Sequence, residues 1–252
     1  MKISRNKDKN IGRVLFIVEG EKTEFWLLRR IFKDILDYQY EYKKRMGQYR
    51  KVNEKEKITS SVCVVNAQSS AITSLDDSNE YLNQLFAELI EVHNFPVDRA
   101  AIYYLFDRDG GSNKNSKFIL DLIDRLGNAT DNGEYRQGLL LLSYPAVESF
   151  VASNFISGSY MLQFEYGHQL KHHLHAQTIN QSRISEETLQ KAVEELVTAI
   201  EHFGFGPYDV SSFHRLVFEY QEQQYQTSST YSVLSLLAIV LLDLGIFEVV
   251  DE

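Results

Sequence analysis

Acidic residues follow several short apolar runs of this chain, at positions from which they can act together. Three places stand out: Glu19 after 14–18, Asp107 and Asp109 after 101–106, and Glu148 shortly after 138–143. Continuous apolar runs are typical of strands that are buried on both faces, as in parallel sheets. The carboxyl ends of parallel strands meet at one edge of the sheet, where ligands bind. The spacing therefore predicts a group of carboxylates at that edge.

A group of carboxylates is costly unless its members share protons or a cation. Their hard oxygens suit Mg²⁺ or Mn²⁺, and two acids in Asp-x-Asp spacing can reach one ion where a strand end curves. Each piece alone has a plainer interpretation. A lone Asp-x-Asp is usually a solvated turn, and a Glu after a strand is usually a loop residue or a charge at a helix N-terminus. Their combination predicts a metal site formed by Glu19, Asp107, Asp109 and Glu148.

The elements that must position these acids alternate between strand and helix. The run 61–65 is a further predicted strand, and residues 43–60 are expected to form a polar excursion. Helical patterns are expected over 23–38, 79–93, 118–126 and 147–155, the last with Pro145 where a first turn can begin. This order predicts an α/β fold, a parallel sheet with crossover helices, through about residue 157.

The pattern changes after residue 157. Residues 158–183 are polar and rich in His, and Ser185 is a plausible N-cap for the helix that follows. Further helices are expected over 186–203, 211–225 and 231–244. We therefore expect an α/β domain over 1–157, with a basic insertion near 40–58, and a helical appendage over 158–252 that serves as a partner or dimer interface.

Two segments, VLFIVEGEKTE (14–24) and YLFDRD (104–109), resemble the Toprim domain, which carries a Glu after its first strand and an Asp-x-Asp after its third. The longer EGEKTE, together with SYPAVESF (143–150), is similar to the RloB-like branch near the OLD-family nucleases. Relatives often have bulkier residues and Trp around the YPxxE motif, where this chain has Ala146, Ser149 and Phe150. The resemblance spans about 14–157 and implies a Toprim (Rossmann-like) parallel sheet. It carries no inference for the C-terminal part.

The resemblance implies roles for individual acids. Glu19, Asp107 and Asp109 match the core Toprim acids, and Glu24 and Glu148 match acids specific to the branch. The implied activity is Mg²⁺-dependent endonuclease cleavage of a phosphodiester. Bound ions held by these acids would orient a phosphate and a water for in-line attack. Glu19 is then a ligand or a general base.

The resemblance also implies partners. Relatives are effectors beside an ABC-type ATPase in bacterial anti-phage systems, including the PARIS type, and transfer RNA is one target class. No G-x-x-x-x-G-K-S/T motif occurs, so the ATPase must be another chain. DNA and RNA both stay open as substrates, and a homodimer in the cytoplasm is expected. Two alternatives remain: a Toprim-shaped binding or regulatory subunit with little activity of its own, and a primase-like nucleotidyl transfer domain.

The charge is unevenly distributed. The formal net charge is −9, but residues 1–57 hold 16 of the 26 Lys and Arg against 9 of the 35 Asp and Glu, a net +7. Basic residues interleaved with tyrosines can hold a polyanion and stack bases, although a charge run is more often a solvated face. The predicted substrate-binding residues are Lys22, Lys114 and Lys117 near the acids, and Lys43, Lys44 and Arg45 beside Tyr40, Tyr42 and Tyr49.

Several classes of protein are excluded or disfavoured. The single cysteine, Cys63, rules out an intramolecular disulfide and a Cys-based zinc site, and favours a reducing cytosol. The apolar run after the basic start is too short for a signal peptide. The apolar stretch 233–250 contains Asp243 and Glu248, so we expect a buried helix and no membrane partner.

Other reactive residue types are interpreted as structural. His168 and His172 have a chelating spacing, and His173 and His175 lie nearby, but no other motif supports zinc, so surface or interface histidines are expected. Tyr144 and Tyr231 are expected to be structural rather than nucleophiles, and Phe25 and Trp26 are expected in the core.

Overall fold

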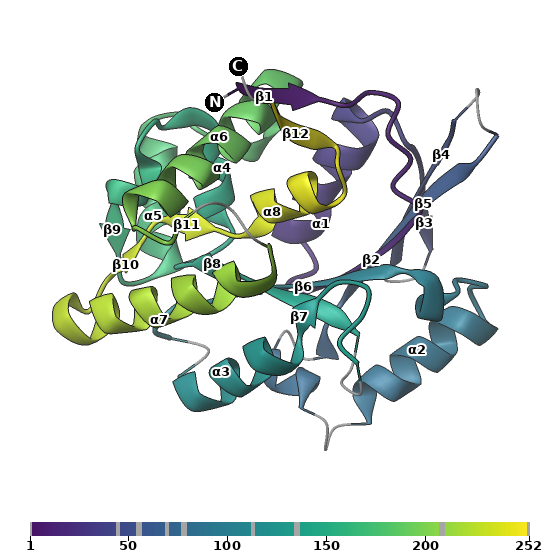
Figure 1. The fold of residues 1–252 in the computed structure, drawn as a ribbon, viewed down its shortest axis with the longest axis horizontal. Coiled ribbons are helices and arrows are strands. Elements are labelled where there is room, and N and C mark those ends of the chain that lie inside the picture. Colours follow the sequence, from purple (N-terminus) through teal and green to yellow (C-terminus); the bar gives the residue numbers. More distant parts are fainter. Residues whose placement is uncertain are drawn as a thin grey trace.

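A computed structural model describes residues 2–43, 46–53, 57–68, 71–76, 80–111, 114–133, 137–206 and 210–250. Within these residues a central sheet of eight strands has the order β11-β8-β6-β2-β5-β4-β3, with β7 also paired to β8 (Figure 1). Its strands are β2 (Arg13–Val18), β3 (Gln39–Lys43), β4 (Met46–Val52), β5 (Thr59–Asn66), β6 (Ala101–Asp107), β7 (Gly127–Asn128), β8 (Gly138–Tyr144) and β11 (Leu234–Ser235). Two small antiparallel pairs lie outside it: β1 (Lys2–Arg5) with β12 (Phe247–Val250), and β9 (Gln163–Phe164) with β10 (Tyr231–Ser232).

The four central strands are parallel, as the apolar runs predict. β2 pairs with β5 on one side and with β6 on the other, and β6 pairs with β8. Residues 14–18 and 102–106 are buried, as are all residues of β8. Such burial on both faces explains why these strands are apolar throughout rather than alternating. The protein is thus an α/β protein with a mixed, mostly parallel sheet flanked by helices.

Helices cover both faces of the sheet. They are α1 (Thr23–Arg29), α2 (Tyr81–Glu91), α3 (Ser116–Arg125), α4 (Glu148–Phe155), α5 (Gly167–Ala176), α6 (Glu186–His202), α7 (Val210–Ser228) and α8 (Leu237–Asp243). Figure 1 shows α2 and α3 below the sheet, and α1, α4 and α8 above it with α6 outside them. α1 continues as a π-helical turn over Arg30–Ile35. The helices predicted from the sequence lie here within a few residues, except the last, although α4 begins only at Glu148, after Pro145.

The predicted polar excursion at 43–60 is wrong for most of its length. β3 and β4 form an antiparallel hairpin that extends the sheet beyond β5. Met46, Gln48 and Tyr49 are buried, and the Tyr49 ring packs 4.9 Å from that of Tyr40. β4 could not be recognised in the sequence because only its first residues, 46–49, are buried. The charged residues at its other end dominate the composition of the segment.

The helix predicted over 231–244 is also corrected. Residues 231–235 are extended and form β10 and β11, and α8 begins only at Leu237. β11 pairs antiparallel with β8, so the chain after residue 157 supplies a strand to the central sheet. Most of the buried apolar residues after residue 157 belong to the same core cluster as those of the parallel strands, whereas Leu170, Leu174 and Val233 belong to a second, smaller cluster.

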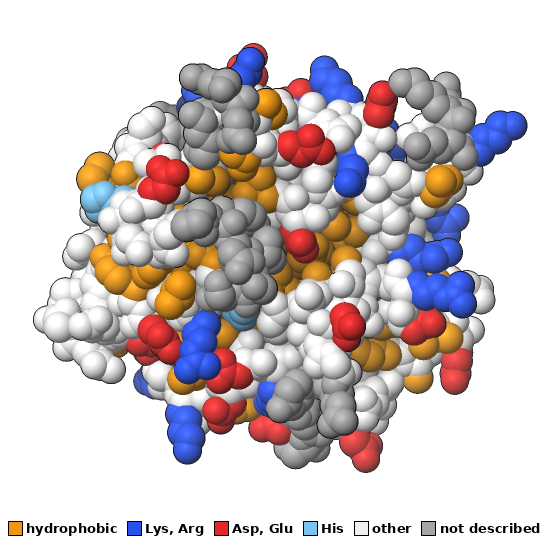
Figure 2. Space-filling model, viewed as in Figure 1, with side chains coloured by type: hydrophobic (Ala, Val, Ile, Leu, Met, Phe, Trp, Pro, Cys, Tyr) orange, Lys and Arg blue, Asp and Glu red, His pale blue; other side chains and the backbone are white. Residues whose placement is uncertain are grey.

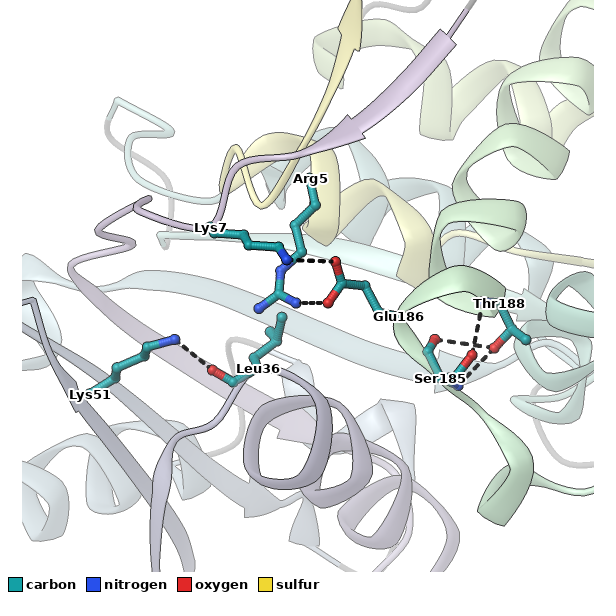
Figure 3. Close-up of polar contacts among 7 residues, drawn as sticks. All are labelled: Arg5, Lys7, Leu36, Lys51, Ser185, Glu186 and Thr188. Carbon is teal, nitrogen blue, oxygen red and sulfur yellow. Dashed lines mark hydrogen bonds and ion pairs between the residues drawn. The ribbon is translucent and has the colours of Figure 1, made fainter.

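The N-terminal strand is held by the C-terminal part (Figure 3). The Arg5 guanidinium forms an ion pair with Glu186 at the start of α6, and Lys7 lies 3.9 Å from the same carboxylate. Ser185 caps this helix as predicted, because its Oγ accepts a hydrogen bond from the Thr188 N–H while the Thr188 hydroxyl accepts one from the Ser185 N–H. These contacts add to the β1–β12 pairing.

The core position predicted for Trp26 is wrong. Its side chain is 41 % exposed, whereas Leu27, Leu28 and Ile31 turn toward the sheet. Phe25 is partly buried against the core. A hydrophobic residue is not always placed on the buried stripe of its helix. In the described ranges, no helix has both the length and the apolar character that crossing a bilayer requires.

Candidate carboxylate site

Acids from β2 and β6 meet at the carboxyl edge of the sheet. Val18 pairs with Leu105, so Glu19 and Asp107 extend from neighbouring strand ends. The Glu19 N–H donates to the Leu105 carbonyl oxygen at 3.0 Å, and Glu19 Oε2 accepts from the Asp107 N–H at 2.7 Å. The Glu19 side chain therefore bridges the two strands directly. This juxtaposition was predicted from the positions of the acids after their strands.

Asp107 is also hydrogen-bonded to the turn that follows β8. Its Oδ1 accepts a hydrogen bond of 2.8 Å from the Val147 N–H, in the turn between β8 and α4. Asp109 follows on the loop, where its Oδ1 accepts from the Gly111 N–H at 2.8 Å. One backbone donor thus orients each carboxylate of the Asp-x-Asp pair.

Glu24 joins the group from the first turn of α1. It is buried, and its Oε1 accepts from the Gly20 N–H at 3.1 Å. A Cβ at position 20 would lie 2.7 Å from Glu24 Oε2, so only glycine lets the carboxylate approach the backbone there. The close approach of the Glu24 carboxylate therefore explains the glycine at position 20 of the EGEKTE segment.

Burial and mutual repulsion raise the pKa values of these acids. Desolvation by burial raises the pKa of Glu19 to about 7, and the nearby charges of Glu24 and Asp109 add to this effect. Burial raises the pKa of Asp107 well above its usual value, with further contributions from the charges of Glu19, Glu24 and Glu148. Burial also raises the pKa of Glu24. Without a cation, ionisation of all these carboxyl groups at once would cost free energy.

Lys171 provides a cation that the sequence analysis did not anticipate. It lies on α5, and its Nζ is 3.3 Å from Glu148 Oε1 at the start of α4. Its charge also lowers the pKa of Glu24, against the dominant effect of burial. Lys171 stands among the histidines of α5, and no spacing in the sequence connects it to the acids.

Residues of α7 contact the Asp-x-Asp loop. Arg108, between the two aspartates, is buried, and its Nη2 donates to Glu222 Oε2 at 2.9 Å and to Ser116 Oγ at 3.0 Å. Its guanidinium also lies over the ring of Tyr231, 5.6 Å from the centroid. At the next turn of the loop, a Cβ on Gly110 would overlap the Tyr225 hydroxyl. Residues of α7 therefore fix the loop that carries the predicted catalytic acids.

The donor set suits a hard divalent cation in its chemistry. Carboxylate oxygens with raised pKa values are the groups that such a cation would stabilise in their ionised form. In the described residues, no three His, Cys, Asp or Glu side chains are already arranged around one point where a metal ion would fit. The residues to hold it would be Glu19 and Asp107, linked by the hydrogen bond from the Asp107 N–H to the Glu19 carboxylate, with Asp109 and Glu148 beside them.

The predicted basic residues are distributed around this edge. Met46 pairs with Val65, and Val65 with Ile17, so the end of β3 and the start of β4 lie at the same edge of the sheet as Glu19. Lys43 forms an ion pair of 3.2 Å with Glu41, while Lys44 and Arg45 lie outside the described residues. Figure 2 shows Lys and Arg side chains gathered over the part of the molecule where β3–β5 lie. Lys22 and Lys114 are exposed on the loops that follow β2 and β6, and Lys117 is exposed in the first turn of α3.

The tyrosines and histidines interpreted as structural lie as expected. Tyr144 and Tyr231 are fully buried, with their rings 5.8 Å apart. His168, His172 and His175 are exposed on α5, and His173 is partly buried against Phe164.

Comparisons with known proteins add no relative. A scan against protein-family models found no match, and searches of curated proteins and of solved structures found none either.

Proposed function

We propose that this protein is a metal-dependent nuclease with a Toprim-type sheet, which hydrolyses phosphodiester bonds of nucleic acid. One observation carries the proposal: Glu19 and Asp107 lie on neighbouring strand ends and share a hydrogen bond, with Glu24, Asp109 and Glu148 close enough to alter their pKa values. Clustered carboxyl groups with strongly shifted pKa values are typical of functional sites. The order of the EGEKTE, DRD and YPAVE segments, quoted above, favours the Toprim type.

Each residue would have a distinct task. Asp107, Asp109, Glu19 and Glu148 would hold Mg²⁺ or Mn²⁺, which when bound supplies positive charge for the phosphate and acidifies water. The Val147 N–H keeps one Asp107 oxygen in a fixed direction. Glu19 would be either one of these ligands or the general base that accepts the proton of the attacking water, a task for which burial raises its pKa to about 7 in the metal-free protein. Lys171 would offset charge on the transferring phosphate.

The charge distribution supports a polyanionic substrate. Lys43, at the end of β3, lies at the same sheet edge as the acids and would add positive charge where the substrate approaches. The exposed Lys22, Lys114 and Lys117 would contact the phosphates on either side. We further propose, from the resemblance alone, that the substrate includes transfer RNA and that an ABC-type ATPase on another chain controls a cytoplasmic homodimer in anti-phage defence.

A second candidate is a binding or regulatory subunit with little activity of its own. The observation that favours it is that protein groups already engage the acids: Asp107 with Val147, and Glu148 with Lys171. In such a subunit these contacts would hold the acids in place, and no substrate would be converted.

Cleavage assays separate the two candidates. Purified protein is incubated with Mg²⁺ and labelled single-stranded, double-stranded and transfer RNA substrates, with and without ATP and any ABC-type ATPase that a neighbouring gene encodes. Wild type should cleave at least one substrate, and Glu19→Gln and Asp107→Asn should lose at least about 100-fold, as expected for groups that act in the chemical step. Asp121→Asn, an exposed acid of α3, is the matched control and should cleave normally. Equal cleavage by all four proteins would overturn the assignment, and binding without cleavage would favour the regulatory subunit.

A further inference from the structure

One side of α5 carries a row of basic side chains. Its members follow one another at intervals of three and four residues, which keeps them on the same side of a helix. They are His168, Lys171, His172 and His175, and we name them the α5 stripe. All four are exposed, whereas Leu170 and Leu174 of the same helix are buried. The stripe therefore faces water along its whole length.

The charge around the stripe differs from that of the rest of the C-terminal part. Between Glu165 and Glu186 the chain contains no Asp or Glu, although residues 58–252 hold 26 of the 35 acids and only 10 of the 26 Lys and Arg. Four of the seven histidines lie in this stretch. Histidine is the side chain that ordinarily gains its positive charge between pH 8 and 5. The stripe thus combines the charge of Lys171 with up to three more below neutral pH.

The helix that carries the stripe lies against the turn that holds the acids, and Figure 1 shows it beside α4. Gly167 packs so closely on this turn that a Cβ there would lie 2.6 Å from the Ala146 Cβ. The residue after Ala146 donates its N–H to Asp107. One helical turn further along α5, Lys171 Nζ lies 3.3 Å from Glu148 Oε1. The stripe therefore runs alongside the carboxylate site.

We propose that the α5 stripe binds the phosphate backbone of the nucleic acid and holds it along the carboxylate site. The inference rests on the proposed nuclease function. His168 and His175 are about 10 Å apart along the helix axis, at about 1.5 Å per residue. This length matches about three successive phosphates of one duplex strand, which are about 3.4 Å apart along its axis. Lys171 would contact the phosphate nearest Glu148, and the histidines would contact the phosphates on either side.

Binding at this stripe should depend on pH. A bound phosphate stabilises a protonated imidazole, because opposite charges attract, so the histidines would take up protons as the backbone binds. The other titratable and charged groups around α5 are Glu24, Asp109, Glu148, Glu165, Tyr166, His173, Arg183 and Tyr225. The acids among them repel phosphate less once they are protonated, which also strengthens binding at low pH. Variants of the histidines are therefore needed to isolate the stripe.

The salt dependence of binding counts the phosphates that the stripe contacts. Each phosphate neutralised in a single strand adds about 0.7 to the slope of log affinity against log salt concentration. Fluorescent thymine oligomers of DNA and uracil oligomers of RNA, about twenty nucleotides long, are titrated in EDTA, where no metal-dependent cleavage occurs. The measurements are made at pH 8 and at pH 5.5 over a series of KCl concentrations. The wild-type slope should steepen by about 2 at pH 5.5, because three histidines gain charge.

Two triple variants and one control separate the stripe from the other groups. His168→Gln, His172→Gln and His175→Gln combined should lose the added slope and keep the wild-type affinity at pH 8. The corresponding His→Lys triple variant should have at pH 8 the slope that wild type reaches only at pH 5.5. His173→Gln is the matched control, because its ring packs on Phe164 outside the stripe, and it should respond to pH as wild type. The three stripe positions are exposed, so both triple variants should fold.

The outcomes distinguish the stripe from the nuclease function. A wild-type response to pH in the triple Gln variant, or an equal loss in His173→Gln, would overturn the stripe and leave the nuclease function standing where wild type cleaves with Mg²⁺. Competition by a polyglutamate peptide as strong as that by unlabelled oligomers would assign the stripe to an acidic protein and overturn it as well. A wild-type protein that neither binds nor cleaves nucleic acid would overturn the nuclease function, and the stripe with it.

Discussion

Arg108 and Glu222 form an ion pair of 2.9 Å in which both side chains are withdrawn from water, at 4 % and 13 % exposure. The arginine lies between the two aspartates of the Asp-x-Asp loop, and the glutamate lies on α7, more than a hundred residues later in the chain. The pair thus fastens the loop that carries Asp107 and Asp109 to the C-terminal part of the molecule. This contact makes α7 a support of the candidate site.

Removing one member of this pair should be costly. Glu222→Ala leaves the Arg108 charge buried without its counter-ion, and we expect a loss of about 3 kcal/mol in the free energy of unfolding. Glu219→Ala is the control on the same helix, because Glu219 pairs with Arg215 at the surface and should contribute less than about 1 kcal/mol. Urea denaturation of the three proteins measures both values. Losses of equal size would show that burial of the Arg108 pair has no special weight.

Gly110 should tolerate no larger residue while Tyr225 is present. A Cβ there overlaps the tyrosine hydroxyl, so Gly110→Ala should cost about 1–3 kcal/mol through overpacking. Tyr225→Phe removes the overlapping oxygen, and the double variant should recover part of the loss. The coupling energy from the four unfolding curves is the measurement. Additive effects would mean that the loop moves away from α7 without cost.

The metal-free protein should lose stability as the pH rises from about 4.5 to 7. The pKa of Glu19 is about 7 in the folded protein against 4.5 as its ordinary value. The folded state therefore holds a proton that the unfolded state releases, so the stability due to this group is complete below 4.5 and lost by pH 7. The expected change is about 3 kcal/mol. Thermal melting from pH 4.5 to 8 measures it.

Glu19→Gln is the variant that isolates this effect. It cannot ionise but keeps an oxygen for the Asp107 N–H, so its stability should fall less steeply with pH. Asp107 contributes in the same direction, so a residual slope is expected. Glu91→Gln, exposed on α2, serves as the control and should retain the slope of wild type. A wild-type slope in Glu19→Gln would assign the pH dependence elsewhere.

Divalent cations should stabilise the protein most at alkaline pH. At pH 8 the clustered acids are closer to ionised, so Mg²⁺ at about 100 times its dissociation constant should add roughly 2.7 kcal/mol to the free energy of unfolding. Asp107→Asn should abolish most of this gain, and Asp121→Asn should retain it. Melting curves over a Mg²⁺ titration provide the comparison, with K⁺ at matched ionic strength to exclude a general salt effect. An equal response of both variants would place the cation outside the carboxylate site.

The central strands could be predicted from the sequence because they are buried on both faces and therefore apolar throughout. For the same reason Glu19 and Asp107 could be placed at one edge before their hydrogen bond was seen. The strand of 234–235 could not be predicted, since two extended residues within an apolar stretch look like part of a buried helix. Trp26 was misplaced because helix periodicity alone does not tell which side faces the sheet.

The supporting residues were beyond the reach of local patterns. Lys171 meets Glu148, and Glu222 meets Arg108, across distances in the chain that no spacing rule covers. Both lie in the part after residue 157, where the resemblance to a family ends. In the sequence Lys171 is only a cation on a His-rich helix, and Glu222 is only an acid on a polar helix. Residues of both kinds are common on any protein surface.

The β1–β12 pairing brings Lys2 opposite Val250, so the first and last described strands lie side by side. A short linker joining them would turn this pair into a hairpin, and the chain could be reopened in an exposed loop as a circular permutant. Such a permutant keeps every contact while making the most distant one in the chain local. Its folding rate, compared with that of the parent, reports when this contact forms. An unchanged rate places it after the barrier, and a faster rate makes it part of the nucleus.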